Sequence, residues 1–155
     1  MEKVDTILAY KNSPKIIQEK DSFSYSIDST VLSFFCDIKK RCDKIIDFGS
    51  GNGIVPLLLS MRTKKPIYGI EIQKSSYDRS LRSISLNGLD GQIKIINDDI
   101  KNVRNLFEAS SFSLVTSNPP YFKKAVVHGA PVLVLPVRPN TGIERYCYSA
   151  SIYYL

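Results

Sequence analysis

The first residues of this chain that could do chemistry lie between Ile45 and Gly53, in the order I-I-D-F-G-S-G-N-G. Glycines at alternate positions let the backbone turn sharply and approach a ligand where a Cβ atom would collide. Asp47 stands just before the turn, and its carboxylate would repel a pyrophosphate but suits a ligand with a cationic end. The stretch predicts a turn that binds a cofactor.

The spacing around this turn distinguishes two classes of cofactor. Glu71 follows Gly51 by 20 residues, where a carboxylate would accept hydrogen bonds from both ribose hydroxyls of an adenosyl group. The glycines read G-x-G-x-G, with Asn52 before the last one, and not the G-x-G-x-x-G of nicotinamide enzymes. Together with Asp47, this spacing favours S-adenosylmethionine over a dinucleotide.

A second polar stretch, Asn118-Pro119-Pro120-Tyr121, has the residue types needed to activate a planar amine. The lone pair of such an amine is delocalised into its ring, so its N–H groups must be held by acceptors before the nitrogen attacks. The Asn118 side-chain oxygen and the Pro119 carbonyl supply two acceptors on a backbone that two prolines restrict. Tyr121 would stack on the base, which is worth roughly 1–3 kcal/mol. Alone, the stretch would also fit a structural turn, but the upstream glycine turn favours catalysis.

Alternating strands and helices must position these residues. We expect strands at 44–48, 66–70, 92–96 and 112–117, and helices at 54–61, 74–87 and about 103–107. This order predicts an α/β fold with a mostly parallel, Rossmann-like sheet and helices on both faces. Polar side chains end each strand and should meet at one edge of the sheet: Asp47, Glu71, Asp98, Asp99 and Asn118.

The region before the glycine turn is less regular. Residues 1–22 predict a hairpin or an extended arm, and Asp28 is expected to cap a helix. The aromatic residues on either side of Asp28 are expected in the core, although their position also allows them to wall a cofactor pocket: Phe23, Tyr25, Phe34 and Phe35.

The motifs D-F-G-S-G-N-G and N-P-P-Y together resemble class I S-adenosylmethionine-dependent methyltransferases that methylate amino groups. Two upstream stretches, K-I-I-Q and F-S-Y-S-I-D-S, and the continuation N-P-P-Y-F narrow the resemblance to bacterial tRNA (adenine-N6)-methyltransferases, which modify the adenosine next to the anticodon of a valine tRNA. The resemblance covers about residues 4–124.

The resemblance implies S-adenosylmethionine as cofactor, tRNA as partner, and a role for each matched residue. Asp47, Gly49, Gly51 and Asn52 would line the methionine end of the cofactor, Glu71 would hold the ribose, and Asp99 with Ile100 would meet the adenine, with Asp98 as the competing acid. Ser26 and Asp28 would close the cofactor pocket. Asn118, Pro119, Pro120 and Tyr121 would be catalytic.

The pattern breaks after Lys124, where the family continues into a seven-stranded sheet. Prolines flanking 132–137 argue against a central strand there, so the strand ending at Asn118 is expected at the edge of a sheet that lacks its C-terminal strands. A truncated or divergent product would explain this. We expect an N-terminal arm and pocket-closing segment (1–43), a cofactor-binding core (44–124) and an atypical tail (125–155).

Composition sets wider limits. The 155 residues carry a formal net charge of +6, which makes nucleic acid a plausible partner of a single globular domain. The three cysteines show no C-x-x-C spacing, so neither a disulfide framework nor a metal site is expected. The sequence has no signal-peptide pattern and no apolar run long enough to span a membrane, so we expect a cytoplasmic protein without a membrane partner.

Three functions remain open from the sequence. The first is methylation of the N6 amine of an adenine in tRNA. The second is N-methylation of another planar amine or amide, such as a protein glutamine or an adenine in rRNA or DNA. The third is an inactive fragment that binds the cofactor.

Overall fold

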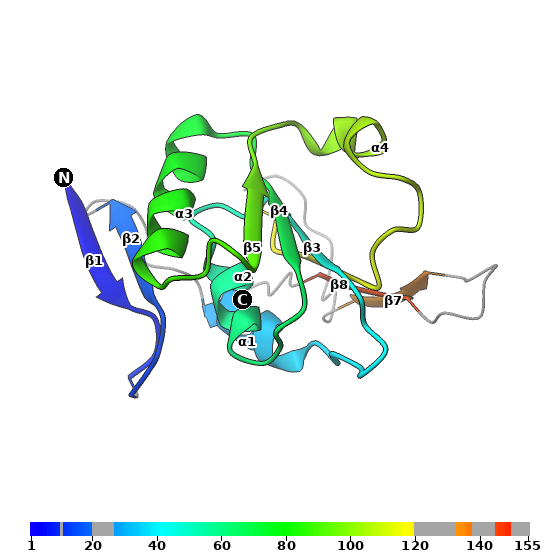
Figure 1. Cartoon of the computed structure of the whole chain (residues 1–155), viewed down its shortest axis with the longest axis horizontal. Coiled ribbons are helices and arrows are strands. Elements are labelled where there is room, and N and C mark those ends of the chain that lie inside the picture. Colours follow the sequence, from blue (N-terminus) through cyan, green and yellow to red (C-terminus); the bar gives the residue numbers. More distant parts are fainter. Residues whose placement is uncertain (10, 20–26, 120–132, 138–144, 150–155) are drawn as a thin grey trace, which may run out of the picture.

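The computed structural model describes residues 1–9, 11–19, 27–119, 133–137 and 145–149. Its main sheet has six strands in the order β5-β4-β3-β6-β8-β7, and β1 and β2 form a separate two-stranded sheet (Figure 1). The strands are β1 (Glu2–Thr6), β2 (Lys15–Glu19), β3 (Ile45–Phe48), β4 (Ile67–Ile70), β5 (Ile93–Ile96), β6 (Leu114–Ser117), β7 (Leu133–Val137) and β8 (Arg145–Ser149). The helices are α1 (Ile27–Phe35), α2 (Ile54–Ser60), α3 (Lys74–Leu86), the 3-10 turn η1 (Ile100–Asn102) and α4 (Val103–Leu106).

The strands β3 to β6 confirm the predicted parallel core, with boundaries within two residues of the expected ones. β3 is central and pairs in parallel with β4 on one side and β6 on the other. Each of these strands is short and mostly apolar, as expected for strands that are covered on both faces. The strand order reverses at β3, and the crevice beyond such a switch point is where open α/β sheets bind ligands.

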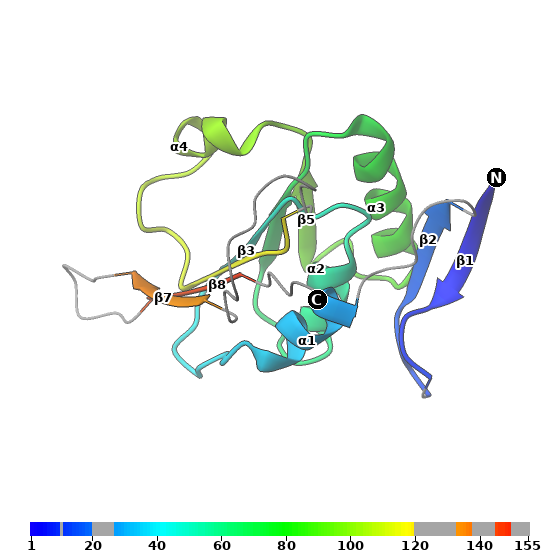
Figure 2. The same ribbon diagram turned by 180° about the vertical axis from the view of Figure 1, so that it is seen from behind.

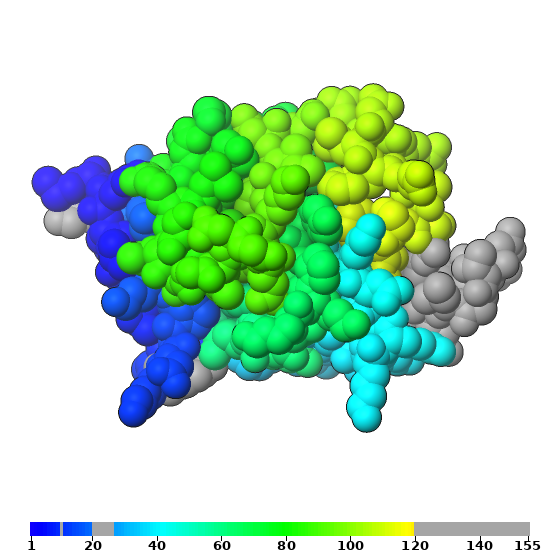
Figure 3. Space-filling view, viewed as in Figure 1, coloured from blue at the N-terminus to red at the C-terminus, as the bar shows by residue number. Residues whose placement is uncertain are grey.

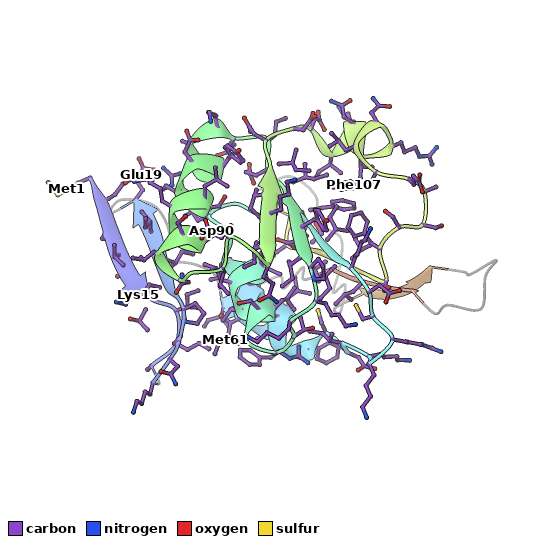
Figure 4. All side chains as sticks on the ribbon, viewed as in Figure 1. Met1, Lys15, Glu19, Met61, Asp90 and Phe107 are labelled. Carbon is purple, nitrogen blue, oxygen red and sulfur yellow. The ribbon has the colours of Figure 1, made fainter. Side chains whose placement is uncertain are left out.

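Helices cover both faces of the sheet, as predicted. The core cluster on one face joins α1, α2 and α3 to alternate residues of the strands, such as Ile45, Ile67 and Leu114. On the opposite face, α4 and the loop after it pack against the intervening residues, and three aromatic rings meet edge to face: Tyr68, Phe107 and Phe112. Figure 2 shows α4 on the side away from α1, and Figure 4 labels Phe107 within the aromatic group.

The N-terminal residues form the predicted hairpin, which packs beside α3 (Figure 3). The guanidinium of Arg82 donates two hydrogen bonds of 2.7 Å to the carboxylate of Glu2. The side chain of Asn87 accepts from the backbone N–H of Lys15 at 2.9 Å and donates to its carbonyl at 2.7 Å. These contacts attach β1 and β2 to the main body without joining them to the main sheet.

The structure corrects two expectations for α1. Asp28 lies inside the first turn of the helix and is buried there, so it does not stand at the cap position. Phe34 and Phe35 are 45% and 58% exposed, so they are not core residues. Phe23 and Tyr25 lie outside the described residues. Within the described ranges, no helix is long and apolar enough to cross a membrane.

The expectation that β6 is an edge strand is wrong. β8 pairs with β6 in parallel along its whole length, and β7 pairs antiparallel with β8 at the outside of the sheet. The outer position of β7 agrees with the prolines in and beside it, because proline has no backbone N–H to donate to a neighbouring strand and is therefore confined to edge strands. The described sheet therefore has six strands, one fewer than the resemblance implies, but β6, the strand before Asn118, has a neighbouring strand on both sides.

Candidate active site

A hollow lies at the carboxyl edge of the main sheet. Five predicted site residues line it: Asp47, Gly49, Gly51, Asn52 and Asn118. They come from the end of β3, the turn into α2 and the end of β6, so the sheet brings together residues that are up to 71 positions apart in the sequence.

Asp47 carries the strongest electrostatic perturbation of this site. Asp47 is 2% exposed, and its carboxylate accepts a hydrogen bond of 2.6 Å from the hydroxyl of Thr116, which lies opposite Asp47 on β6. The pKa of Asp47 is raised to about 7: burial raises it most and the negative charge of Glu71 also raises it, while hydrogen bonds from Thr116 and Ser50 lower it. A cationic group placed beside Asp47 would favour its ionised form.

The glycine turn has the conformation that its sequence predicts. Gly49, Gly51 and Gly53 have φ angles of 71°, 55° and 86°, in the left-handed region that side chains disfavour. The backbone N–H groups of Gly49 and Ser50 donate to the Ile70 carbonyl at 2.9 and 3.1 Å, which attaches the turn to the end of β4. Cβ atoms built at Gly49 and Gly51 would meet nothing within 4 Å, so this side of the turn is open.

A glycine that the sequence analysis did not single out supports the turn from below. A Cβ atom at Gly69 on β4 would collide with the Ser50 hydroxyl and the side chain of Ile95. The Ser50 hydroxyl donates to the backbone carbonyl of Asp47 at 3.0 Å. The missing side chain at position 69 therefore lets the turn sit directly on the sheet.

Glu71 reaches the glycine turn but does not line the hollow. Its carboxylate accepts hydrogen bonds of 2.7 Å from the backbone N–H groups of Gly51 and Gln73. Each carboxylate oxygen has a second lone pair, so these bonds leave Glu71 able to accept from a ligand hydroxyl.

Asp98, Asp99 and Ile100 lie beyond the end of β5, outside the lining of the hollow. The side chain of Asn97 donates to the Glu71 carbonyl at 2.7 Å, which holds this loop beside the end of β4. Asp98 accepts from the backbone N–H of Asp99 at 2.7 Å, whereas Asp99 accepts from the backbone N–H of Lys101 at 2.9 Å. Both acids thus have local backbone partners, and these contacts do not select one of them.

Asn52 is held in place by Arg79 of α3. The Arg79 Nε–H donates to the side-chain oxygen of Asn52 at 3.0 Å, and its Nη1 lies 3.7 Å from a carboxylate oxygen of Glu19 on β2. One guanidinium therefore contacts both the glycine turn and the hairpin. Sequence reasoning did not assign this role to Arg79.

Asn118 enters the hollow from the end of β6, and its Nδ2 donates to the Ser29 hydroxyl at 2.8 Å. Pro119 is exposed. Ser26, Pro120 and Tyr121 lie outside the described residues. Asp28 is 1% exposed and does not line the hollow, but the next residue, Ser29, does.

Residues without a predicted role complete the walls of the hollow: Ile16, Gln18, Ser29, Ser50, Ile54 and Val55. Ile16 and Gln18 are buried alternate residues of β2, so the strand period places both on one face. The stretch K-I-I-Q was recognisable as part of the resemblance, but its own residue pattern did not indicate that the hairpin would line the site. In the part of the chain that the structure describes, no cluster of His, Cys, Asp and Glu is arranged to hold a metal ion.

Comparison with known protein families identifies the family of this chain. The model of a family described as "Methyltransferase small domain" matches residues 15–132. The chain belongs to the methyltransferase small domain family. The match includes β2, the glycine turn and the stretch that begins at Asn118. This membership confirms the resemblance to class I methyltransferases that depend on S-adenosylmethionine.

Proteins that are similar in sequence carry more specific names. The chain is 30% identical over 116 residues to a tRNA1(Val) (adenine(37)-N6)-methyltransferase of Tolumonas auensis, an alignment that covers 74% of this chain and 45% of that protein. It is 29% identical over 113 residues to the enzyme of the same name from Haemophilus influenzae strain PittGG, with 72% of this chain and 48% of that protein covered. The chain thus spans about half the length of these relatives.

Solved structures agree on the fold. A putative transferase from Pyrococcus horikoshii superposes with a TM-score of 0.59 at 16% identity, over 74% of this chain and 42% of that one. A geranyl diphosphate C-methyltransferase from Streptomyces coelicolor A3(2) superposes with a TM-score of 0.53 at 14% identity, over 59% of this chain and 33% of that one. At these identities the likeness concerns the fold alone.

The residues of the hollow fit the cofactor of the methyltransferase small domain family. S-adenosylmethionine has a cationic amino group, and the buried carboxylate of Asp47 lines the hollow where that charge could be paired. The open side of the glycine turn leaves room for close approach to the backbone. Glu71, bonded to Gly51, would stand beside the same ligand.

Proposed function

We propose that this chain transfers a methyl group from S-adenosylmethionine to the exocyclic N6 amine of an adenine in RNA, with tRNA as the first substrate class. The observation that carries the proposal is that Asn118 lines the same hollow as Asp47 and the glycine turn. An acceptor for the amine would therefore lie beside the residues that would bind the methyl donor.

The residues after β6 would activate the amine. The Asn118 Oδ1 and the Pro119 carbonyl would each accept one N–H hydrogen bond, which draws the nitrogen from planar towards tetrahedral geometry and frees its lone pair. Tyr121 would stack on the adenine and offset the cost of removing the base from an RNA loop. Catalysis would then rest mainly on positioning.

The cofactor supplies an electrophilic methyl group when bound, and the chain's residues would orient it. Asp47 would pair with the amino group, and Glu71 would accept from the ribose hydroxyls. The remaining cofactor residues would be Gly49, Gly51 and Asn52 at the methionine end, Asp99 with Ile100 at the adenine, and Ser26 with Asp28 at the closing segment. Asp98 competes with Asp99 for the adenine.

Two observations support RNA as the substrate. The similar relatives are named as tRNA methyltransferases, and the chain carries a formal net charge of +6, which suits a phosphate backbone. A tRNA substrate would place the chain in the cytoplasm. An N-P-P-Y stretch suits any planar amine or amide, so protein glutamine, rRNA and DNA are the substrates to test against it.

Cofactor binding is tested first. Isothermal titration of the chain with S-adenosylmethionine at pH 8 should show one site per chain. Without binding, both the tRNA proposal and its alternatives as an enzyme fail.

Transfer is tested with a radiolabelled methyl donor offered with total tRNA, rRNA, DNA or protein extract in parallel. Label in tRNA that is recovered as N6-methyladenosine supports the proposal, whereas label in another fraction alone replaces its substrate. Binding without any transfer makes the chain a cofactor-binding fragment.

The role of Asn118 is tested by Asn118→Ala. Turnover should fall by at least about a hundredfold, as for loss of a positioned hydrogen-bonding group at a reacting atom, while cofactor affinity stays within about twofold. Equal losses of turnover and affinity would contradict a role in activating the amine.

A further inference from the structure

The orientation of the Asn118 side chain has an identifiable cause in α1. The Asn118 Nδ2 donates a hydrogen bond of 2.8 Å to the Ser29 hydroxyl, across 89 residues of sequence. Ser29 is 5% exposed, lies in the first turns of α1 and lines the hollow together with Asn118. The contact therefore lies at the edge of the proposed reaction site and is partly buried.

The two ends of an asparagine amide differ in chemistry although they are similar in shape. The oxygen accepts hydrogen bonds and the nitrogen donates them, and the terminal torsion of the side chain has two nearly equivalent wells. Only Oδ1 can accept an N–H of an amine. With Nδ2 directed at the amine, two donors would face each other and the amine would not be activated.

We propose that Ser29 is a positioning residue for the methyl transfer: by accepting from Nδ2, its hydroxyl holds the Asn118 amide in the orientation that presents Oδ1 to the amine. Because the amide is planar, an Nδ2 directed at Ser29 places Oδ1 on the other side of the group. This inference rests on the proposed function of Asn118 and adds a residue that the catalytic stretch itself does not contain.

The chain offers a matched control one helical turn away. Ser33 is fully buried, and its hydroxyl donates to the Ser29 carbonyl at 2.6 Å. Ser33→Ala thus removes a serine hydroxyl from the same helix as Ser29→Ala does, and this hydroxyl contacts Ser29 but not Asn118. A loss that arises only from disturbing α1 would appear in both variants.

The first experiment separates turnover from cofactor affinity. Ser29→Ala should lower kcat about tenfold, the size expected for one hydrogen bond, and leave the Kd for S-adenosylmethionine within about twofold. Ser33→Ala should change neither, and Ser29→Thr, which keeps the hydroxyl, should restore most of kcat. In an Asn118→Ala background, Ser29→Ala should cause no further loss. An equal loss in Ser33→Ala, or a loss that persists without the Asn118 amide, overturns the proposal.

The second experiment needs no activity. The side-chain amide protons of Asn118 are identified in a ¹⁵N–¹H spectrum by their disappearance in Asn118→Ala. In the wild type they should exchange slowly with water, in Ser29→Ala at least about tenfold faster, and in Ser33→Ala as in the wild type. Unchanged exchange in Ser29→Ala overturns the inference. If the wild type transfers no methyl group, the proposed function fails, and this measurement still decides whether Ser29 holds the amide.

Discussion

Replacing Asp47 by asparagine should stabilise the cofactor-free protein, and increasingly so as the pH rises. Asp47 is buried on β3, and the pKa of its carboxyl is raised from 3.8 to about 7, chiefly by burial. The folded protein therefore binds this proton more tightly than the unfolded chain does. Stability from this group is fully present at pH values below about 4 and is lost as the pH rises towards 7. The asparagine side chain of the variant carries no charge to bury.

The size of the effect follows from the two pKa values. The difference between 3.8 and about 7 corresponds to about 4 kcal/mol when the carboxyl is fully ionised in both states. Because the unfolded carboxyl is already mostly ionised at pH 5, part of this cost is present there. The advantage of Asp47→Asn in free energy of unfolding should therefore grow by about 2–3 kcal/mol between pH 5 and pH 8.

Urea unfolding followed by far-ultraviolet circular dichroism, at each pH unit from 5 to 9, measures this growth. Asp43→Asn, at an exposed aspartate just before β3, is the matched control and should show no comparable growth. An advantage of Asp47→Asn that stays constant with pH, or that shrinks as the pH rises, would refute burial of a titrating carboxyl at this position.

Three further predictions concern the cofactor. Affinity for S-adenosylmethionine should fall up to tenfold per pH unit below about 7, as Asp47 takes up its proton. Thr116→Val should shift the pH at which this fall begins upward by about one pH unit, because it removes a hydrogen bond that lowers the pKa of Asp47. Titration calorimetry across pH checks both predictions, and a pH-independent affinity would contradict them. Gly69→Ala should cost about 1–3 kcal/mol of stability and weaken cofactor binding, since the new Cβ would displace the glycine turn; urea unfolding with and without cofactor checks this, and an unaffected variant would show that the turn can move. Arg79→Met should weaken cofactor binding roughly tenfold, whereas Arg82→Met, which removes a hairpin contact that does not reach the turn, should not; equal losses in the two variants would assign the effect to the hairpin.

The parallel core could be predicted from local signals. Its strands are short apolar runs that end at polar residues, and its glycines stand where the turn needs a left-handed backbone. Asp47 and Asn118 were therefore identifiable as neighbours at one edge of the sheet, since parallel strands end together. Glu71 was placed correctly at the end of β4, but its two backbone partners depend on the loops around it.

Other features depend on long-range packing that no local pattern shows. Three serines form most of the buried face of α3, and a search for apolar periodicity does not count small polar residues: Ser76, Ser80 and Ser83. The pairing of β8 with β6 was missed because R-Y-C-Y-S was interpreted as part of an atypical tail. Ser29 was missed because the importance of its hydroxyl depends on Asn118, which lies 89 residues later.

The pairing of β3 on both sides bears on how this protein matures during synthesis. β4 follows β3 closely in the chain, but Thr116, the partner of Asp47 on β6, lies 69 residues downstream. While the ribosome is still making those residues, the carboxylate of Asp47 lacks the Thr116 hydroxyl and the neighbouring strand β6, so it is less buried than in the folded protein. The Asp47 carboxylate becomes fully buried only when β6 pairs with β3, and a contact between residues so far apart in the sequence slows folding. The nascent chain therefore has the glycine turn well before it has a site that could retain a cofactor.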